Sequence, residues 1–177
     1  MARRKMAVAL VLEGDLALEV DGLRRALGGD RDHVAPHVTL VPPIDLREDD
    51  VPAALALVRA AAASVDPFDL VLGPVTTFLP VSPVVYLDVG GDLAAVEALH
   101  GALQAAPLDR PAGHPFVPHV TLALDVSAER TNAAISAMAD FEARWPLRSV
   151  TLLEHRSPGP RTWNPVAEAP LGRRRGG

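Results

Sequence analysis

Two tetrapeptides of identical sequence, His37-Val38-Thr39-Leu40 and His119-Val120-Thr121-Leu122, indicate the fold of this chain. They lie almost half of the 177-residue chain apart. Each follows an apolar run and a segment with helical spacing, and each is followed by another such helix and another apolar run. The sequence therefore predicts an internal duplication. The alternative is a coincidence between two ordinary strands, since Val, Thr and Leu are all common in strands.

Hydrophobic spacing predicts strands and helices in the same order on both sides of the chain midpoint. Strands are predicted at 6–12, 37–44, 68–72 (continued by 75–78), 84–89, 116–126 and 147–154, with a short last strand at 163–171. Helices are predicted at 15–27, 49–65, 92–104 and 127–141. Gly28-Gly29 and Asp92 are expected to cap helices, and Pro42-Pro43 is expected to end the second strand.

The order of these elements predicts an α+β fold of one domain, residues 1–177. We expect a duplicated, bilobal arrangement in which two pseudo-twofold-related lobes of mainly antiparallel sheet, flanked by helices, enclose a central cleft. The lobes are predicted at about 5–80 and 84–171. The segment 172–177 contains three arginines and is predicted to be a flexible basic tail.

The repeated tetrapeptide places polar groups together because side chains alternate between the two faces of a strand. His and Thr share one face, and Val and Leu share the other. A pseudo-twofold axis would bring the two polar pairs together, which gives two imidazoles and two hydroxyls in one cleft. A neutral and a protonated imidazole can exchange protons with the attacking and leaving oxygens of a phosphate ester. The threonine hydroxyls can hold the non-bridging oxygens.

With these motifs the sequence resembles the two-histidine (2H) phosphoesterase superfamily, and within it the 2′-5′ RNA ligase-like and cyclic phosphodiesterase branch. That family carries two His-x-Thr/Ser-x motifs, with x hydrophobic, one in each lobe. The lead-in Phe116-Val117-Pro118 and the stretch 72–87 also resemble the family, and the resemblance covers roughly residues 5–171.

The resemblance implies that His37 and His119 are the catalytic pair and that Thr39 and Thr121 bind the phosphate. It also implies a reaction without metal or other cofactor, on a 2′,3′-cyclic phosphate or a 2′-5′ phosphodiester of an RNA end or small nucleotide. The chain departs from RNA ligase-like members at Leu124, where a basic residue is common. It also departs after the first motif, where prolines replace an aromatic residue.

Three further residues are candidate substrate contacts: Phe78, Tyr86 and Arg156. The aromatic pair is suited to stacking a base, although core packing is the favoured alternative. Arg156, like Arg161, is suited to a phosphate, although a surface ion pair is favoured. His33 and His114 are expected in loops near the cleft mouth and His100 on a helix surface. The sequence assigns no role to His155.

Composition excludes several classes of protein. There is no cysteine, which excludes disulfides, Cys-bound zinc and thiolate nucleophiles. The formal net charge of −5 argues against a protein that coats RNA or binds duplex DNA. The sequence contains no Gly-rich phosphate-binding loop, which argues against ATP-driven or dinucleotide chemistry. The apolar run at 6–12 is too short to span a membrane, so we expect a cytoplasmic monomer that does not bind membranes.

Two rival functions follow from the same residues. A non-catalytic protein that binds nucleotides or RNA ends would keep the two motifs and show no turnover. A metal hydrolase would use the additional histidines. The sequence disfavours the second rival, because Pro36 argues against a helix that presents His33 and His37 together and no carboxylate completes a metal set at the usual spacing.

Overall fold

The computed structural model describes residues 2–29, 34–111, 113–156 and 162–172. Its strands are β1 (Arg3–Val11), β2 (His37–Arg47), β3 (Phe68–Thr77), β4 (Val84–Gly91), β5 (His119–Leu124), β6 (Ala143–Leu147), β7 (Ser149–His155) and β8 (Trp163–Pro170). Its helices are α1 (Gly14–Leu27), α2 (Val51–Ala63), α3 (Leu93–Ala102) and α4 (Ala128–Ala137), and a short 3₁₀ turn, Glu48–Asp50, precedes α2.

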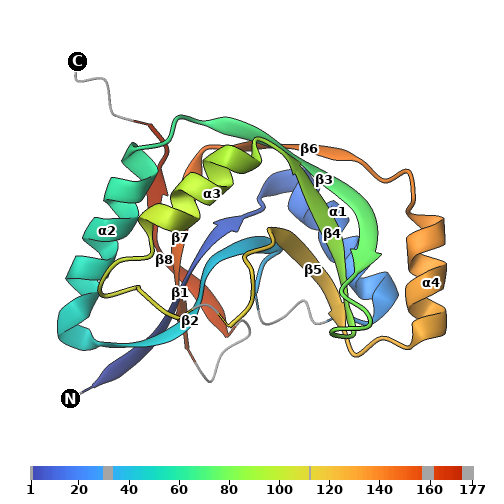
Figure 1. Cartoon of the computed structure of the whole chain (residues 1–177), viewed down its shortest axis with the longest axis horizontal. Coiled ribbons are helices and arrows are strands. Elements are labelled where there is room, and N and C mark those ends of the chain that lie inside the picture. Colours follow the sequence, from blue (N-terminus) through green and yellow to red (C-terminus); the bar gives the residue numbers. More distant parts are fainter. Residues whose placement is uncertain (1, 30–33, 112, 157–161, 173–177) are drawn as a thin grey trace.

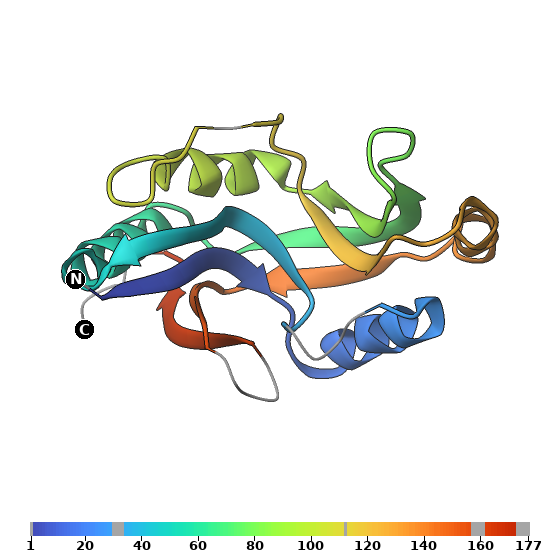
Figure 2. The ribbon, with the colours of Figure 1, turned by 90° about the horizontal axis from the view of Figure 1, so that it is seen from below.

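The strands form one curled antiparallel sheet in the order β6-β3-β4-β5-β2-β1-β7-β8 (Figures 1 and 2). Helices α2 and α4 lie at opposite ends of this sheet in both views. The α+β class and the antiparallel sheet flanked by helices are thus confirmed. No helix in the described part of the chain has the length and apolar content needed to cross a bilayer.

The order of the strands shows that the two repeats exchange strands. β3, the last strand of the first repeat, pairs with β4 of the second repeat. Conversely, β7 pairs with β1. Each half of the sheet therefore contains strands from both sides of the chain midpoint, and the halves meet between β2 and β5. The lobe ranges 5–80 and 84–171 stay a prediction.

A shared irregularity supports the duplication. In the β1–β2 pair Ala9 lies opposite Thr39, and the next pair along the ladder, Val8–Val41, skips one residue of β2. In the β4–β5 pair Tyr86 lies opposite Thr121, and the pair Val85–Ala123 again skips one residue. The extra residue is the leucine of the tetrapeptide in both copies. A β-bulge therefore follows the threonine at the same place in each repeat.

The apolar residues of the motifs fix the orientation of both strands. Val38, Leu40, Val120 and Leu122 are at most 2 % exposed and belong to the main core. That core contains residues of all four helices, with α1 packed on β5 and α3 on β2. Each such Val or Leu stabilises the fold by roughly 1.5–3 kcal/mol. Because the valines and leucines face the helices, the histidines and threonines face the other way.

The prediction that Pro42-Pro43 ends the second strand is wrong, because β2 continues to Arg47. Pairing with β1 passes from Val8–Val41 to Met6–Ile44, so both prolines fall in an irregular stretch of the ladder. A proline lacks the amide hydrogen that a regular ladder needs, and it is tolerated at such a bulge.

The strand predicted at 147–154 corresponds to β7 (Ser149–His155), which pairs with β1. A separate strand that was not predicted, β6 (Ala143–Leu147), precedes it and pairs with β3. β6 alternates buried Trp145 and Leu147 with exposed Arg144 and Pro146. Its position at the edge of the sheet explains why it accommodates a proline. The strand predicted at 116–126 is also shorter, since β5 spans only His119–Leu124.

Candidate active site

The two motifs meet where the halves of the sheet join. Val38 and Val120 are the antiparallel partners that link β2 to β5. This register places His37 beside Thr121 and Thr39 beside His119, on the face of the sheet away from the helices, which we call the motif face. All four side chains are half-buried. The structure therefore brings together the four residues that the repeat singled out.

Each histidine ring is held in the same way. Nδ1 of His37 lies 2.8 Å from the carbonyl oxygen of Ala35, and Nδ1 of His119 lies 2.7 Å from that of Val117. A proline, Pro36 or Pro118, separates ring and carbonyl in both copies. A ring that donates from Nδ1 keeps Nε2 for proton exchange with a ligand. The local backbone thus fixes the orientation of both rings before any substrate binds.

Burial makes His37 a neutral imidazole. It lowers the pKa of His37 to about 4, against the opposing effect of the Ala35 carbonyl, and the charges of Arg24 and His119 lower it further. At neutral pH, His37 therefore has a free lone pair on Nε2 and can accept a proton. Phosphate bound nearby would act in the opposite direction, because a negative charge favours the imidazolium.

A buried arginine of α1 lies behind the site and was not anticipated from the sequence. Arg24 is 3 % exposed. Its Nε donates to the carbonyl of Thr121 at 3.1 Å, and its Nη1 donates to that of Val34 at 2.9 Å. One guanidinium thus ties the second motif to the segment that leads into the first. The available signal was its position four residues after Val20, on the apolar side of α1, but a cation in a last helical turn usually interacts with the helix dipole.

His100 was expected on the surface of its helix, but it is half-buried. Its Nδ1 lies 2.8 Å from the carbonyl oxygen of Leu40, and its ring stacks on Phe116 with centroids 3.8 Å apart. α3 is thus attached to the first motif, much as α1 is attached to the second through Arg24. The helix before the first motif, α1, thus holds the strand of the second motif, and the helix before the second motif, α3, holds the strand of the first.

The aromatic candidates Phe78 and Tyr86 contact the second histidine. Their rings stack with centroids 4.1 Å apart. Both stand edge-on to His119, at 5.0 Å for Phe78 and 5.4 Å for Tyr86. Tyr86 is buried, which raises the pKa of its phenol and keeps it neutral. The pair thus packs against His119.

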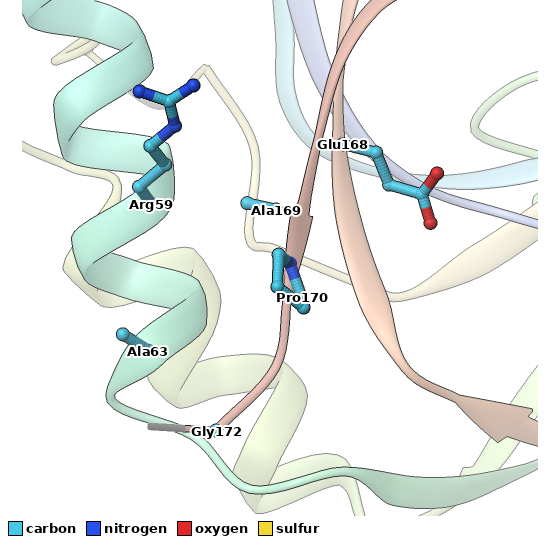
Figure 3. Close-up of a pocket in the computed structure, with 6 residues that line it drawn as sticks. All are labelled: Arg59, Ala63, Glu168, Ala169, Pro170 and Gly172. Atoms are coloured by element: carbon cyan, nitrogen blue, oxygen red, sulfur yellow. The ribbon is translucent and has the colours of Figure 1, made fainter. Parts of the chain in front are cut away.

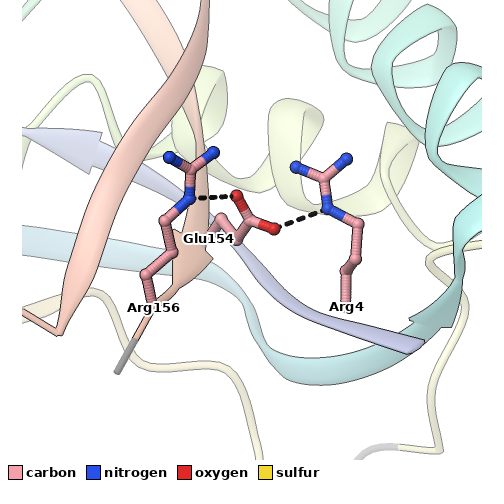
Figure 4. A network of polar contacts seen from close by, with 3 residues as sticks. All are labelled: Arg4, Glu154 and Arg156. Atoms are coloured by element: carbon pink, nitrogen blue, oxygen red, sulfur yellow. Dashed lines mark hydrogen bonds and ion pairs between the residues drawn. The ribbon is translucent and has the colours of Figure 1, made fainter. Parts of the chain in front are cut away.

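Arg156 takes part in an ion-pair network rather than bonding to a motif residue (Figure 4). Its Nε lies 2.6 Å from Glu154, whose other oxygen lies 2.5 Å from Nε of Arg4. The hydrogen bond from Arg4 and the second one from Arg156 hold the pKa of the buried Glu154 carboxyl at about 2. The favoured interpretation of Arg156 as an ion-pair residue is confirmed. Arg161 and His33 lie outside the described residues.

Two hollows lie near the sheet. One, of about 110 Å³, is next to His37 and Thr39 on the motif face. The other, of about 380 Å³, lies between α2 and β8 (Figure 3) and is lined by Arg59, Ala63, Glu168, Ala169, Pro170 and Gly172. Figure 3 shows Glu168 directed away from Arg59, so the larger hollow contains no convergent polar groups. The smaller hollow is the one that belongs to the candidate site.

Metal-binding residues do not gather at the site. No group of three or more His, Asp or Glu side chains suited to a metal ion occurs within the described ranges. His114 is exposed, and His155 stands edge-on to Trp163 at 5.3 Å. The arrangement of two oriented imidazoles and two hydroxyls on one face is suited to proton exchange around a bound phosphate.

Comparison with known proteins identifies the family of this chain. The family model of the 2′-5′ RNA ligase superfamily matches residues 12–159. A protein of Halalkalibacterium halodurans that is named as a phosphoesterase is 37 % identical over 94 residues, which are 53 % of this chain and 54 % of that protein. This match thus spans about half of the relative's length. A protein of Oceanobacillus iheyensis with the same designation is 27 % identical over 69 % of this chain and 71 % of its own length.

Solved structures share the fold at low sequence identity. LigT of E. coli, complexed with 3′-AMP, superposes with a TM-score of 0.70 at 19 % identity, over 96 % of this chain and 99 % of LigT. TT0787 of Thermus thermophilus superposes with a TM-score of 0.69, also at 19 % identity and with the same coverage. LigT has also been crystallised with phosphate, ATP and NADP+.

Proposed function

Because the chain belongs to the 2′-5′ RNA ligase superfamily, we propose that it is a metal-independent phosphoesterase in which His37 and His119 form an acid/base pair. Its substrate is a 2′,3′-cyclic phosphate or a 2′-5′ phosphodiester, at an RNA end or in a small nucleotide. The observation that carries the proposal is the junction of β2 and β5, where both His-Val-Thr-Leu motifs present histidine and threonine on the motif face.

Hydrolysis of a cyclic phosphate uses both histidines at once. Water attacks phosphorus, and one imidazole accepts its proton while the new P–O bond forms. The bond from phosphorus to a sugar oxygen breaks, and the protonated second imidazole gives its proton to that oxygen. The products are a phosphate monoester and a free hydroxyl, and the histidines have exchanged protonation states. The hydroxyls of Thr39 and Thr121 bind the non-bridging oxygens, whose charge they stabilise.

Ligation uses the same groups. A 5′-hydroxyl takes the place of water, gives its proton to one imidazole and attacks the cyclic phosphate. A 2′-5′ linkage forms as the bond from phosphorus to the 3′ oxygen breaks, and the second imidazole protonates that oxygen. The bond energy comes from the strained ring, so this route requires no nucleotide triphosphate. The sequence, which contains no Gly-x-x-x-x-Gly-Lys loop, is consistent with such a reaction.

The proposal is tested with a panel of phosphate esters. Purified protein should hydrolyse 2′,3′-cyclic nucleotides in the presence of EDTA, and the double variant His37→Ala/His119→Ala serves as the blank. His114→Ala is the matched control, because it removes an exposed imidazole that bonds to no motif residue. Turnover by the double variant equal to that of the native protein would refute the proposal.

The same panel separates the two rivals. Binding without turnover across cyclic nucleotides and 2′-5′ oligomers indicates the non-catalytic binding protein. Activity that chelation abolishes and a divalent metal restores indicates a metal hydrolase. Neither result is compatible with the proposed reaction.

A further inference from the structure

The two halves of the site differ at equivalent positions beside their histidines. Ala9 lies opposite Thr39 in the first half, and Tyr86 lies opposite Thr121 in the second. The next strand shows the same difference. Two residues before Ala9 and Tyr86 are Ala7 and Val84, which are therefore equivalent. Leu153 of β7 pairs with Ala7, and at the corresponding place in the second half Phe78 donates its amide to Val84. Aromatic residues thus occur on one side where aliphatic residues occur on the other.

This difference accompanies a hollow beside His37. In the second half the stacked rings of Phe78 and Tyr86 pack against His119. In the first half, the methyl groups of Ala7 and Ala9 leave the hollow of about 110 Å³. Its lining consists of Ala7, Val8, Ala9, Val34, His37, Thr39, Pro43, Leu153 and Trp163.

The lining of the hollow selects for a flat, uncharged group. Its walls are aliphatic apart from the half-buried indole of Trp163, and no Asp, Glu, Lys or Arg lines it among the residues that the structure describes. Only His37 and Thr39 contribute polar side chains, and these lie at its border with the phosphate site. Indoles are among the side chains on which nucleobases stack.

We propose that this hollow is the subsite for the heteroaromatic base of the substrate and that it orients the substrate with its sugar on the His37 side. The inference rests on the proposed function, since it presumes that phosphate binds between the two motifs. β1 and β7 lie one and two strands from β2, or about 5 and 10 Å from it. A single sugar unit bridges a phosphate at the motifs and a base in the hollow.

This orientation assigns the two proton transfers. Attacking and leaving oxygens lie on opposite sides of phosphorus in an in-line displacement. With the sugar near His37, hydrolysis proceeds as follows: water gives its proton to His119, the P–O bond to the sugar breaks, and His37 protonates the released sugar oxygen. In ring closure, the neutral His37 takes the proton of the sugar hydroxyl, which attacks phosphorus, and the opposite P–O bond breaks as His119 protonates its leaving oxygen. Bound phosphate supplies the negative charge that favours the imidazolium form needed for hydrolysis.

The experiment compares a nucleotide with a substrate that lacks the base. Adenosine 2′,3′-cyclic phosphate and a methyl ribofuranoside 2,3-cyclic phosphate are hydrolysed in parallel. The native protein should prefer the nucleotide by about tenfold or more in kcat/KM, the scale of one base-stacking contact. Ala9→Leu, which fills the hollow, should reduce this ratio towards one. Ala94→Leu makes the same change at an exposed position of α3 and should preserve it.

A second variant and a binding measurement cover the other outcomes. Trp163→Leu removes a wall without adding volume, and it should also reduce the ratio if Ala9→Leu fails to fold. Calorimetric binding of adenosine 2′-monophosphate against ribose 2-phosphate gives the same comparison without turnover. Equal kcat/KM for both substrates in the native protein would overturn the subsite and leave the proposed function intact. If neither ester is hydrolysed, the proposed function fails, and equal binding of the two monophosphates would then overturn the subsite.

Discussion

The imidazole of His37 combines burial with a fixed hydrogen bond, and this combination sets its protonation state. Its partner is the Ala35 carbonyl, and its pKa of about 4 lies below the usual value of 6.5. A neutral histidine that is ready to accept a proton therefore faces a threonine of the other motif. The residue type could be predicted from the repeat. Its burial could not, because it depends on α1 and on the segment before β2.

The pKa of His37 predicts how stability depends on pH. The unfolded chain binds a proton at His37 near pH 6.5 and the folded chain only near pH 4, so the unfolded state binds more protons between these values. Native stability should therefore fall as the pH decreases from 6.5 to about 4, by on the order of 1 kcal/mol per pH unit. Urea unfolding at several pH values measures this, and His37→Gln should flatten the slope in that window. An equally steep slope in His37→Gln would show that other groups cause it.

At the scale of elements, helices hold the motif strands through polar contacts to the backbone. Arg24 of α1 reaches the Thr121 carbonyl, and His100 of α3 lies against the Leu40 carbonyl. Periodicity predicted both helices, and Asp92 caps α3 as expected, through the amide of Ala95. It did not predict which strand each helix covers, because spacing along one element contains no information about a partner distant in the chain.

Loss of the buried guanidinium should disturb both motifs. Arg24→Met preserves much of the side-chain volume but leaves the carbonyls of Thr121 and Val34 without these donors, and it removes the cation 3.6 Å from Asp21. We expect a loss of about 3 kcal/mol in unfolding free energy and a lower kcat. Arg25→Met, at the exposed neighbouring position, is the control. Similar urea midpoints for both variants would contradict a structural role for Arg24.

The whole molecule is a duplication whose copies are joined by exchanged strands. The repeated tetrapeptide predicted the duplication, and the identical bulge after Thr39 and Thr121 agrees with it. The exchange of β3 and β7 was not predicted, because both strands have ordinary apolar patterns that fit either half. The asymmetry beside the histidines also required the structure, since only the register shows that Ala9 and Tyr86 are equivalent.

An ion-pair network connects distant parts of the chain within one half of the sheet. Glu154 of β7 bonds to Arg4 of β1, 150 residues away, and the pKa of Glu154 is lowered to about 2. A lowered carboxyl pKa stabilises the fold above its unfolded value of 4.5, and this contribution is lost as the pH falls from 4.5 to about 2. Glu154→Gln should lower the unfolding free energy at pH 7 by on the order of 2 kcal/mol. Its stability should also vary less than that of the native protein below pH 4.5, and an unchanged acid dependence would contradict this role.

The most direct test of the account is the rate of hydrolysis of a 2′,3′-cyclic nucleotide, measured with EDTA for the native protein, His37→Ala, His119→Ala and the double variant. Two groups that transfer protons in one step act as a unit. Each single variant should therefore lose at least about a hundredfold in kcat, and the double variant should lose little more than either. Native activity in either single variant, or losses that multiply in the double variant, would contradict the proposed acid/base pair.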